Sequence, residues 1–259
     1  MQTEGVITSL WTIRNVIRNE GYRWRKAKVS LTSTDRNYRE KVDRIKSILS
    51  NLREDEAFLS VDEYGPFSVR LVRGRQLVGP GVLPTVPQWQ KARGRLILTA
   101  ALELNTNQII HFYSEKKNTG EMIKMIDLIR RRKPAKTAIY FSWDAASWHM
   151  SKALDKHIEF LNGWAAYDRA PKVVLVPLPA RAQFLNVIES VFSGMARAVI
   201  HNSNFEGETE AKKVIDGYID QRNAYFLQHP RRAGDKIWGR ERLPPVFNET
   251  QNFKDPSYR

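Results

Sequence analysis

Near the start of the chain, apolar positions recur every three to four residues, which predicts two helices before the first strand. The first runs from Ser9, a suitable N-cap, to Gly21, a suitable C-terminal stop. The second runs from Asp35 to Leu52. Its apolar face comprises Val42, Ile45, Ile48, Leu49 and Leu52. A short helical segment is therefore expected ahead of the main sheet.

The rest of the chain combines short apolar or alternating runs with further helical patterns. Strands are predicted at 57–61, 67–72, 95–104, 108–113, 137–143 and 172–176. Helices are predicted at about 119–132, 147–161, 184–192 and 208–229. Strands followed by alternating helices and strands predict an α/β fold with a mixed sheet covered by helices. A Gly/Pro-rich stretch from Gly74 to Pro87 predicts a long loop or hairpin arm.

The net charge of the chain says more about its function than its length does. A chain of 259 residues can bury one sizeable core with a small appendage. Its 42 Lys and Arg residues outnumber 28 Asp and Glu, which gives a formal net charge of +14. This surplus favours a polyanion such as nucleic acid as a partner, and a basic protein with no nucleic-acid role is the alternative.

Composition also excludes several classes of site. Because the chain has no cysteine, it cannot form disulfides, cysteine-based zinc sites or a thiol nucleophile. No apolar run approaches the ~20 residues of a membrane helix, and no signal-peptide pattern opens the chain. We therefore expect an intracellular protein with no membrane partner.

Two aspartates end two of the predicted strands. Asp62 follows the apolar run 57–61, and Asp144 follows the run 137–143. If these strands are neighbours in the sheet, both carboxylates face one cleft. An aspartate at the end of a strand is more often solvated or a cap, so neither residue indicates a function alone.

A glutamate on a later helix supplies a third carboxylate. Glu189 is predicted to share a polar helical stripe with Asn186 and Ser193, while the opposite side packs. Mg²⁺ and Mn²⁺ prefer carboxylate oxygens, and a pair of such ions promotes phosphodiester cleavage and joining. Asp62, Asp144 and Glu189 together therefore predict a two-metal catalytic site.

Other polar residues near these carboxylates give weaker signals. Glu63 follows Asp62 directly and would point to the opposite face of a strand, so we do not expect it to be a ligand. His149 is a candidate contact to a DNA phosphate, with a local hydrogen bond at a helix start as the alternative. No histidine pair has zinc-ligand spacing, and no P-loop or nucleophile elbow is present.

Basic residues near the start of the chain are the main candidates for DNA contacts. The first predicted helix carries arginines on its polar side, and the segment that follows interleaves aromatic residues with cations. A helix docked on the core with solvated arginines is the alternative. The DNA-binding candidates are Arg14, Arg18, Arg23, Arg25, Lys26 and Lys28, together with His149 and Asn186.

Three sequence blocks contain the carboxylates: Leu59–Gly65, Phe141–His149 and Leu178–Glu189. Taken in order, they resemble the DDE transposases of bacterial insertion sequences related to the mariner group. The resemblance covers nearly the whole chain and implies a ribonuclease H-like, mixed five-stranded sheet flanked by helices. In that fold the strands of Asp62 and Asp144 are neighbours, and the family's metal-binding triad falls on Asp62, Asp144 and Glu189.

The resemblance also implies an activity and its requirements. A transposase of this kind cuts DNA at transposon ends and inserts the freed 3′-hydroxyl at TA dinucleotides, using two Mg²⁺ or Mn²⁺ ions. Its partners are double-stranded DNA with terminal inverted repeats and a second copy in a dimeric synaptic complex. Its location would be the bacterial cytoplasm, at the nucleoid. The alternatives are a truncated product that binds DNA or a partner without transposing, and a cellular ribonuclease H-like nuclease.

The chain departs from the family pattern in three places. Ala145 stands where relatives commonly have asparagine, and residues 162–168 look like an insertion. Family members usually begin with two helix-turn-helix units, whereas this sequence starts near the last helix of the second. The expected organisation is a residual helix-turn-helix and linker at 1–56, a catalytic domain at 57–245 and a tail at 246–259.

Overall fold

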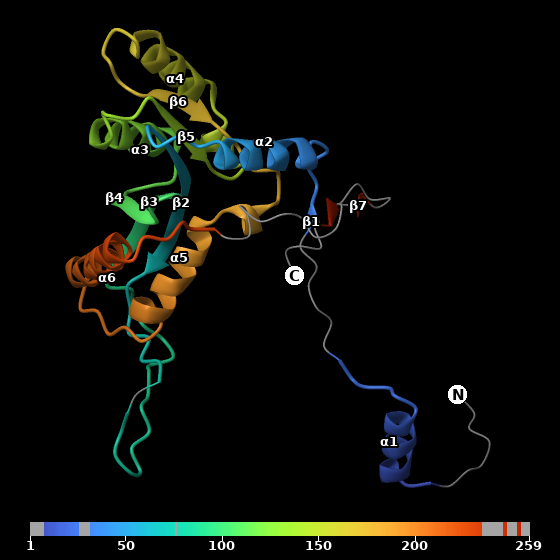
Figure 1. The fold of residues 1–259 in the computed structure, drawn as a ribbon. Helices are drawn as coiled ribbons and strands as arrows, with labels where there is room; N and C mark the ends of the chain where they lie inside the picture. The colour runs from blue at the N-terminus through green and yellow to red at the C-terminus, as the bar shows by residue number, and fades with distance from the viewer. Residues whose placement is uncertain (1–7, 26–31, 76, 235–245, 248–252, 255–259) are drawn as a thin grey trace. The chain divides into compact units, whose positions relative to one another are not determined.

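A five-stranded mixed sheet forms the centre of the larger of two units, residues 31–259, in the computed structural model (Figure 1). The structure describes residues 8–25, 32–75, 77–234, 246–247 and 253–254. In the sheet the strands follow the order β4-β3-β2-β5-β6. They span Glu56–Ser68 (β2), Arg95–Glu103 (β3), Gln108–Ser114 (β4), Ala138–Ser142 (β5) and Lys172–Leu175 (β6).

The strand directions confirm the predicted mixed sheet. β2 pairs antiparallel with β3 on one side and parallel with β5 on the other. β3 and β4 are antiparallel, whereas β5 and β6 are parallel. β2 therefore joins the antiparallel half to the parallel half, and the strands of Asp62 and Asp144 are neighbours as expected.

Helices cover both faces of the sheet. They span Tyr38–Ser50 (α2), Thr119–Arg132 (α3), Lys152–Trp164 (α4), Ile188–Met195 (α5) and Glu208–Gln228 (α6). One core contains Phe58 of β2 together with residues of α2, α5 and α6. The other contains Leu59 and Val61 of β2 with residues of α3 and α4. Successive residues of β2 thus enter different cores, as the alternation of side chains along a strand requires.

The remaining elements are short. Two 3-10 turns span Ser147–His149 (η1) and Gln183–Leu185 (η2), and a π-helical turn, Ala196–Ile200 (η3), continues α5. Three two-residue strands form a small second sheet in the order β1-β8-β7. They span Thr32–Ser33 (β1), Val246–Phe247 (β7) and Phe253–Lys254 (β8). Among the described residues, no helix is both long and apolar enough to cross a bilayer.

The smaller unit, residues 1–30, contains helix α1, Leu10–Asn19. The Ser9 side chain accepts a hydrogen bond from the amide of Thr12, which is the N-cap expected from the sequence. Gly21 follows the helix with φ of +84°, a conformation that favours glycine. None of the residues of α1 is buried, so its apolar stripe does not form a core within the described part of this unit.

The strand that carries Asp62 is longer than predicted. Instead of ending at Asp62 and resuming at 67–72, β2 runs without a break through Ser68, so Asp62 lies within the strand. The physical reason is that β3 continues to pair with β2 after β5 has ended: Asp62 lies opposite Ala100. A register shift between Tyr64 and Phe67 accommodates Gly65 and Pro66.

Two predicted helices also begin later than expected. The helix predicted from residue 147 starts at Lys152, because Ser151 caps it and η1 precedes it. The helix that carries Glu189 starts at Ile188 rather than at residue 184, since η2 comes before it. In both cases a 3-10 turn replaces the first turn of the predicted helix.

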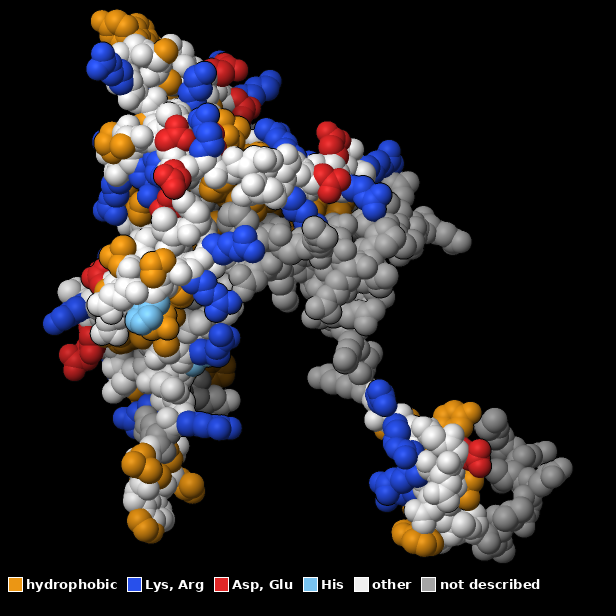
Figure 2. Space-filling model, in the orientation of Figure 1, with side chains coloured by type: hydrophobic (Ala, Val, Ile, Leu, Met, Phe, Trp, Pro, Cys, Tyr) orange, Lys and Arg blue, Asp and Glu red, His pale blue; other side chains and the backbone are white. Residues whose placement is uncertain are grey.

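The predicted arm lies between β2 and β3 and extends away from the sheet (Figure 1). At its base, the amides of Val69 and Arg93 donate to the carbonyls of Gly94 and Val69, respectively. Leu77, Leu83 and Trp89 are highly exposed, and Figure 2 shows hydrophobic side chains at the end of the arm. The arm therefore presents apolar side chains outside both cores.

We expect Gly65→Ala to lower the free energy of unfolding by about 2 kcal/mol or more. Gly65 has φ of +114°, and a Cβ placed there would lie 2.6 Å from the carbonyl oxygen of Leu96. Urea unfolding followed by circular dichroism measures the change. Gly163→Ala, where a Cβ meets nothing within 4 Å, is the control. Equal stabilities of the two variants would contradict the constraint at Gly65.

Candidate functional site

Asp62 lies on the face of β2 that packs against α5, where its carboxylate is almost completely buried. One oxygen, Oδ1, accepts a hydrogen bond from the amide of Glu63 at 2.7 Å. The other, Oδ2, accepts one from Nδ2 of Asn186 at 2.8 Å. The orientation of the Asp62 carboxylate is therefore fixed from two sides.

Asn186 connects Asp62 to the start of α5. Its side-chain oxygen accepts a hydrogen bond from Oγ of Ser60 at 2.5 Å, and that hydroxyl accepts one from the amide of Ile188 at 3.2 Å. Asn186 precedes α5 with ψ of 101°, so the predicted helical stripe with Glu189 is wrong. Because Asn186 is 3% exposed, a hydrogen bond to Asp62 replaces the predicted contact with DNA.

Asp144 follows β5 and is the more accessible aspartate, with its side chain 26% exposed. Its Oδ1 accepts hydrogen bonds from Nδ1 of His149 at 2.8 Å and from the amide of Ala146 at 3.1 Å. The hydrogen bond from His149 is the main reason that the pKa of Asp144 is lowered, and burial opposes it. Asp144 is thus held as a carboxylate.

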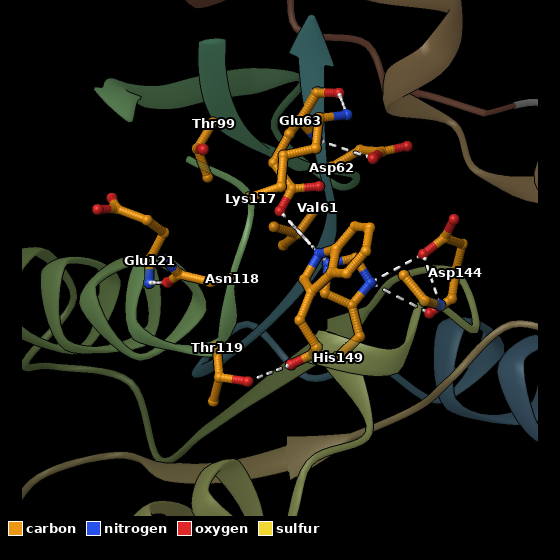
Figure 3. Close-up of polar contacts among 12 residues, drawn as sticks. Val61, Asp62, Glu63, Thr99, Lys117, Asn118, Thr119, Glu121, Asp144 and His149 are labelled. Atoms are coloured by element: carbon orange, nitrogen blue, oxygen red, sulfur yellow. Dashed lines mark hydrogen bonds and ion pairs between the residues drawn. The ribbon is translucent and has the colours of Figure 1, made fainter. Parts of the chain in front are cut away.

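His149 is a buried residue rather than a surface contact for DNA (Figure 3). Its ring stacks on Trp143, with 5.4 Å between the ring centroids, and meets Trp148 edge-on, with 5.6 Å between the centroids. Burial disfavours the charged ring, but Asp144 and Glu63 outweigh it and raise the pKa of His149 to about 9. The side chain is 1% exposed, so its partners lie within the protein and the predicted DNA contact is replaced.

Glu189 lies in the first turn of α5 and is exposed. Its charge acts on Asp62, whose pKa is raised to about 7. Burial is the largest cause of that shift; the charges of Glu189, Asp144 and Glu63 add to it, and the amide of Glu63 opposes it. Glu189 and Asp144 are therefore near enough for their charges to act on Asp62.

The donor set suits a hard divalent cation. All three predicted ligands offer carboxylate oxygens, and their mutual repulsion is what a bound cation would remove. Within the described residues, however, no three Asp, Glu, His or Cys side chains converge closely enough to hold an ion. Glu189 is thus coupled to Asp62 by charge, but its side chain does not join a formed ligand shell.

Lys117 is a residue near the site that the sequence did not single out. It lies between β4 and α3, and its Nζ donates to the backbone oxygen of Glu63 at 3.0 Å. Its charge also helps to lower the pKa of Asp144. The sequence places Lys117 just before a predicted helix. It does not show the contact with Glu63, because that contact depends on β2, which is far away in sequence.

The predicted N-terminal DNA contacts lie in the separate unit of residues 1–30. Arg14, Arg18, Arg23 and Arg25 are exposed, and Lys26 and Lys28 lie outside the described residues. A cavity of about 270 Å³ has a lining of both arginines and aromatic residues. Its lining comprises Arg14, Ile17, Arg18, Tyr22, Arg23 and Trp24. Figure 2 shows Lys and Arg side chains along one side of this unit.

The chain is similar to known proteins in sequence family and in fold. The family model of the DDE superfamily endonucleases matches residues 57–211. The structure of the Mos1 mariner paired-end complex with Mn has a TM-score of 0.58 and 15% identity, covering 85% of this chain and 67% of that one. The corresponding complex with Mg has a TM-score of 0.56 and 16% identity, covering 84% and 65%.

The Mos1 strand transfer complex is similar too, with a TM-score of 0.55 and 17% identity over 84% of this chain and 68% of that one. At these identities the likeness establishes the ribonuclease H-like fold. The present chain spans about two thirds of the length of these transposases. No curated protein sequence matches it significantly.

We expect Asp62→Asn to stabilise the metal-free protein at pH 8. Because the folded state raises the pKa of Asp62 to about 7, it binds more protons than the unfolded chain between about pH 4 and 7. The free energy of unfolding therefore falls as pH rises through this window. Removing the carboxylate should recover about 1–3 kcal/mol at pH 8 and almost nothing near pH 4.

Thermal melting of wild type and variant across this pH range measures the effect. Asp43→Asn, on the exposed side of α2, is the control for loss of one negative charge. Millimolar Mn²⁺ should reduce the difference in melting temperature between Asp62→Asn and wild type at pH 8, since a cation favours the ionised aspartate. A difference in melting temperature between Asp62→Asn and wild type that is the same at every pH would contradict a role for the raised pKa of Asp62.

Proposed function

This chain belongs to the DDE superfamily endonucleases, and from that premise we propose that it is the catalytic part of a DNA transposase. It would cut DNA at transposon ends and join the freed 3′-hydroxyl to target DNA at TA dinucleotides. The observation that supports this best is the placement of Asp62 on β2 and of Asp144 just after β5, the parallel neighbour of β2, with the charge of Glu189 acting on Asp62.

In the proposed mechanism, Asp62, Asp144 and Glu189 would hold two Mg²⁺ or Mn²⁺ ions. When bound, such ions activate the attacking oxygen and stabilise the leaving one. The protein's own contribution is to hold the carboxylates in place before DNA arrives. Asn186 orients Asp62, and His149 orients Asp144 while keeping it ionised.

The proposed partners are duplex DNA that carries terminal inverted repeats and a second copy of the chain. Paired-end complexes among the similar structures support this proposal. The apolar arm between β2 and β3 is a candidate contact with the second copy or with DNA, because Leu77, Leu83 and Trp89 are exposed on it.

The proposed organisation keeps a DNA-binding segment separate from a catalytic domain at 57–245 and a tail at 246–259. Residues 1–30 form their own compact unit, which supports separating that segment from the core. Tyr38, Val42 and Ile45 of α2 lie in the core that contains Phe58, so we extend the proposed catalytic domain from residue 57 back to include α2.

We expect Asp62→Asn, Asp144→Asn and Glu189→Gln each to reduce DNA cleavage about 100-fold or more, because removing a metal ligand takes away several kcal/mol of transition-state stabilisation. The assay uses a labelled duplex containing the DNA that flanks the coding sequence, with Mg²⁺ or Mn²⁺. Glu159→Gln, an exposed change on α4, is the control.

Cleavage that persists in Asp144→Asn would refute the assignment of the triad. Equal cutting of an unrelated plasmid without joined products would instead indicate a nuclease. Binding without cleavage by the wild-type chain would indicate a product that does not transpose.

We expect Arg14→Ala combined with Arg18→Ala to weaken duplex binding roughly tenfold at low salt. The slope of log affinity against log salt should decrease by about one unit for each phosphate that is no longer neutralised by an arginine. Fluorescence anisotropy at several salt concentrations measures both quantities. Lys152→Ala with Lys156→Ala removes two exposed charges at the same spacing on α4 and is the matched control. Equal weakening in both double variants would argue against a DNA role specific to α1.

A further inference from the structure

Glu63 is a carboxylate that the proposed metal chemistry leaves without a function. It follows Asp62 on β2 and points to the opposite face, toward the core that contains α3 and α4. Its side chain is 1% exposed. A buried carboxylate is costly unless it is paired, so the contacts of Glu63 show what keeps it there.

The side-chain contacts of Glu63 with described residues lead to the turn that follows Asp144. Oε1 of Glu63 accepts a hydrogen bond from Nε1 of Trp148 at 3.1 Å. The same oxygen lies 3.6 Å from Nε2 of His149, which is an electrostatic contact rather than a hydrogen bond. On the other side of the ring, Nδ1 of His149 donates to Oδ1 of Asp144 at 2.8 Å.

One imidazole thus lies between two carboxylates, one on β2 and one just after β5 (Figure 3). Trp143 stacks on the ring and Trp148 meets its edge, so the ring has little freedom to rotate. The imidazole fixes Oδ1 of Asp144, whereas Oδ2 makes no hydrogen bond with any residue that the structure describes. One oxygen of Asp144 is held and the other remains available.

We propose that Glu63 and His149 are positioning residues that orient Asp144 for metal binding. This inference rests on the proposed function, because it takes Asp144 to be a metal ligand. The two neighbouring residues Asp62 and Glu63 then act on both ligands. Asp62 is one ligand itself, and Glu63 holds His149, which orients the other ligand, Asp144. Hydrogen-bonded partners of ligands typically contribute 10–100-fold to metal affinity.

The test measures Mn²⁺ binding to the full chain without DNA, by the electron paramagnetic resonance signal of free Mn²⁺. Loss of binding in Asp144→Asn identifies the relevant site. We expect Glu63→Gln, which keeps an oxygen for Trp148 but removes the charge, to weaken that binding 10–100-fold. Glu56→Gln is the matched control, because Glu56 is a buried carboxylate at the other end of β2, bonded to the hydroxyl of Tyr140.

A second pair of variants protects the test against misfolding. His149→Asn can still donate to Asp144 from the position of Nδ1, whereas His149→Ala cannot. We expect Mn²⁺ affinity to decrease in the order wild type, His149→Asn, His149→Ala. Melting temperatures of all variants are measured alongside, since a purely structural role would lower stability without this order.

Three results would overturn the inference: unchanged Mn²⁺ affinity in Glu63→Gln, equal weakening in Glu63→Gln and Glu56→Gln, or no binding by the wild type that depends on Asp144. The proposed function fails separately. If the wild type cuts no DNA but Glu63→Gln weakens Mn²⁺ binding, the positioning role stands without transposition. If Asp144→Asn abolishes cleavage and Glu63→Gln binds Mn²⁺ normally, transposition stands and the positioning role is refuted.

Discussion

The parallel pairing of β2 with β5 decides where the two aspartates of the site lie. The pairing ends at Ser60 of β2 and Ser142 of β5, and Asp62 and Asp144 each follow two residues later. β2 continues along β3, so Asp62 stays on a rigid strand, whereas Asp144 enters a turn. One aspartate is therefore fixed by the sheet, and the other needs side-chain contacts to fix it.

Concentrated negative charge is the main cost of this arrangement. Burial and, after it, the charges of Glu189, Asp144 and Glu63 raise the pKa of Asp62 to about 7. The fold offsets part of this repulsion near Asp144 with His149 and Lys117. Near Asp62 the compensation comes from neutral donors, which align the carboxylate without neutralising it. A carboxylate that is aligned in this way, and that pairs with no cation among the described residues, suits a site that binds a metal ion.

Local periodicity was sufficient to predict the element order, the sheet type and the arm, because each depends on patterns within about ten residues. It misplaced the end of the Asp62 strand, since Gly65 and Pro66 look like a strand end but are accommodated by a register shift against β3. It placed Asn186 on a helix, because a 3-10 turn and a helical turn have similar apolar spacing. It left His149 open between a DNA contact and a local hydrogen bond, and the local bond to Asp144 is the one observed. The approach of Glu63 to the same ring could not be predicted, because β2 is far away in sequence.

Adjacent acidic residues on a strand are not interchangeable when both faces of the sheet are covered. Alternation sends Asp62 toward Asn186 and Glu63 toward Trp148 and His149. A carboxylate buried on the second face requires a positive or hydrogen-bonding partner, and the turn after β5 supplies both. Because the same turn begins with Asp144, pairing Glu63 also restrains the more accessible aspartate. The burial of one carboxylate is thus linked to the orientation of another, and β2 contributes to both sides of the candidate site.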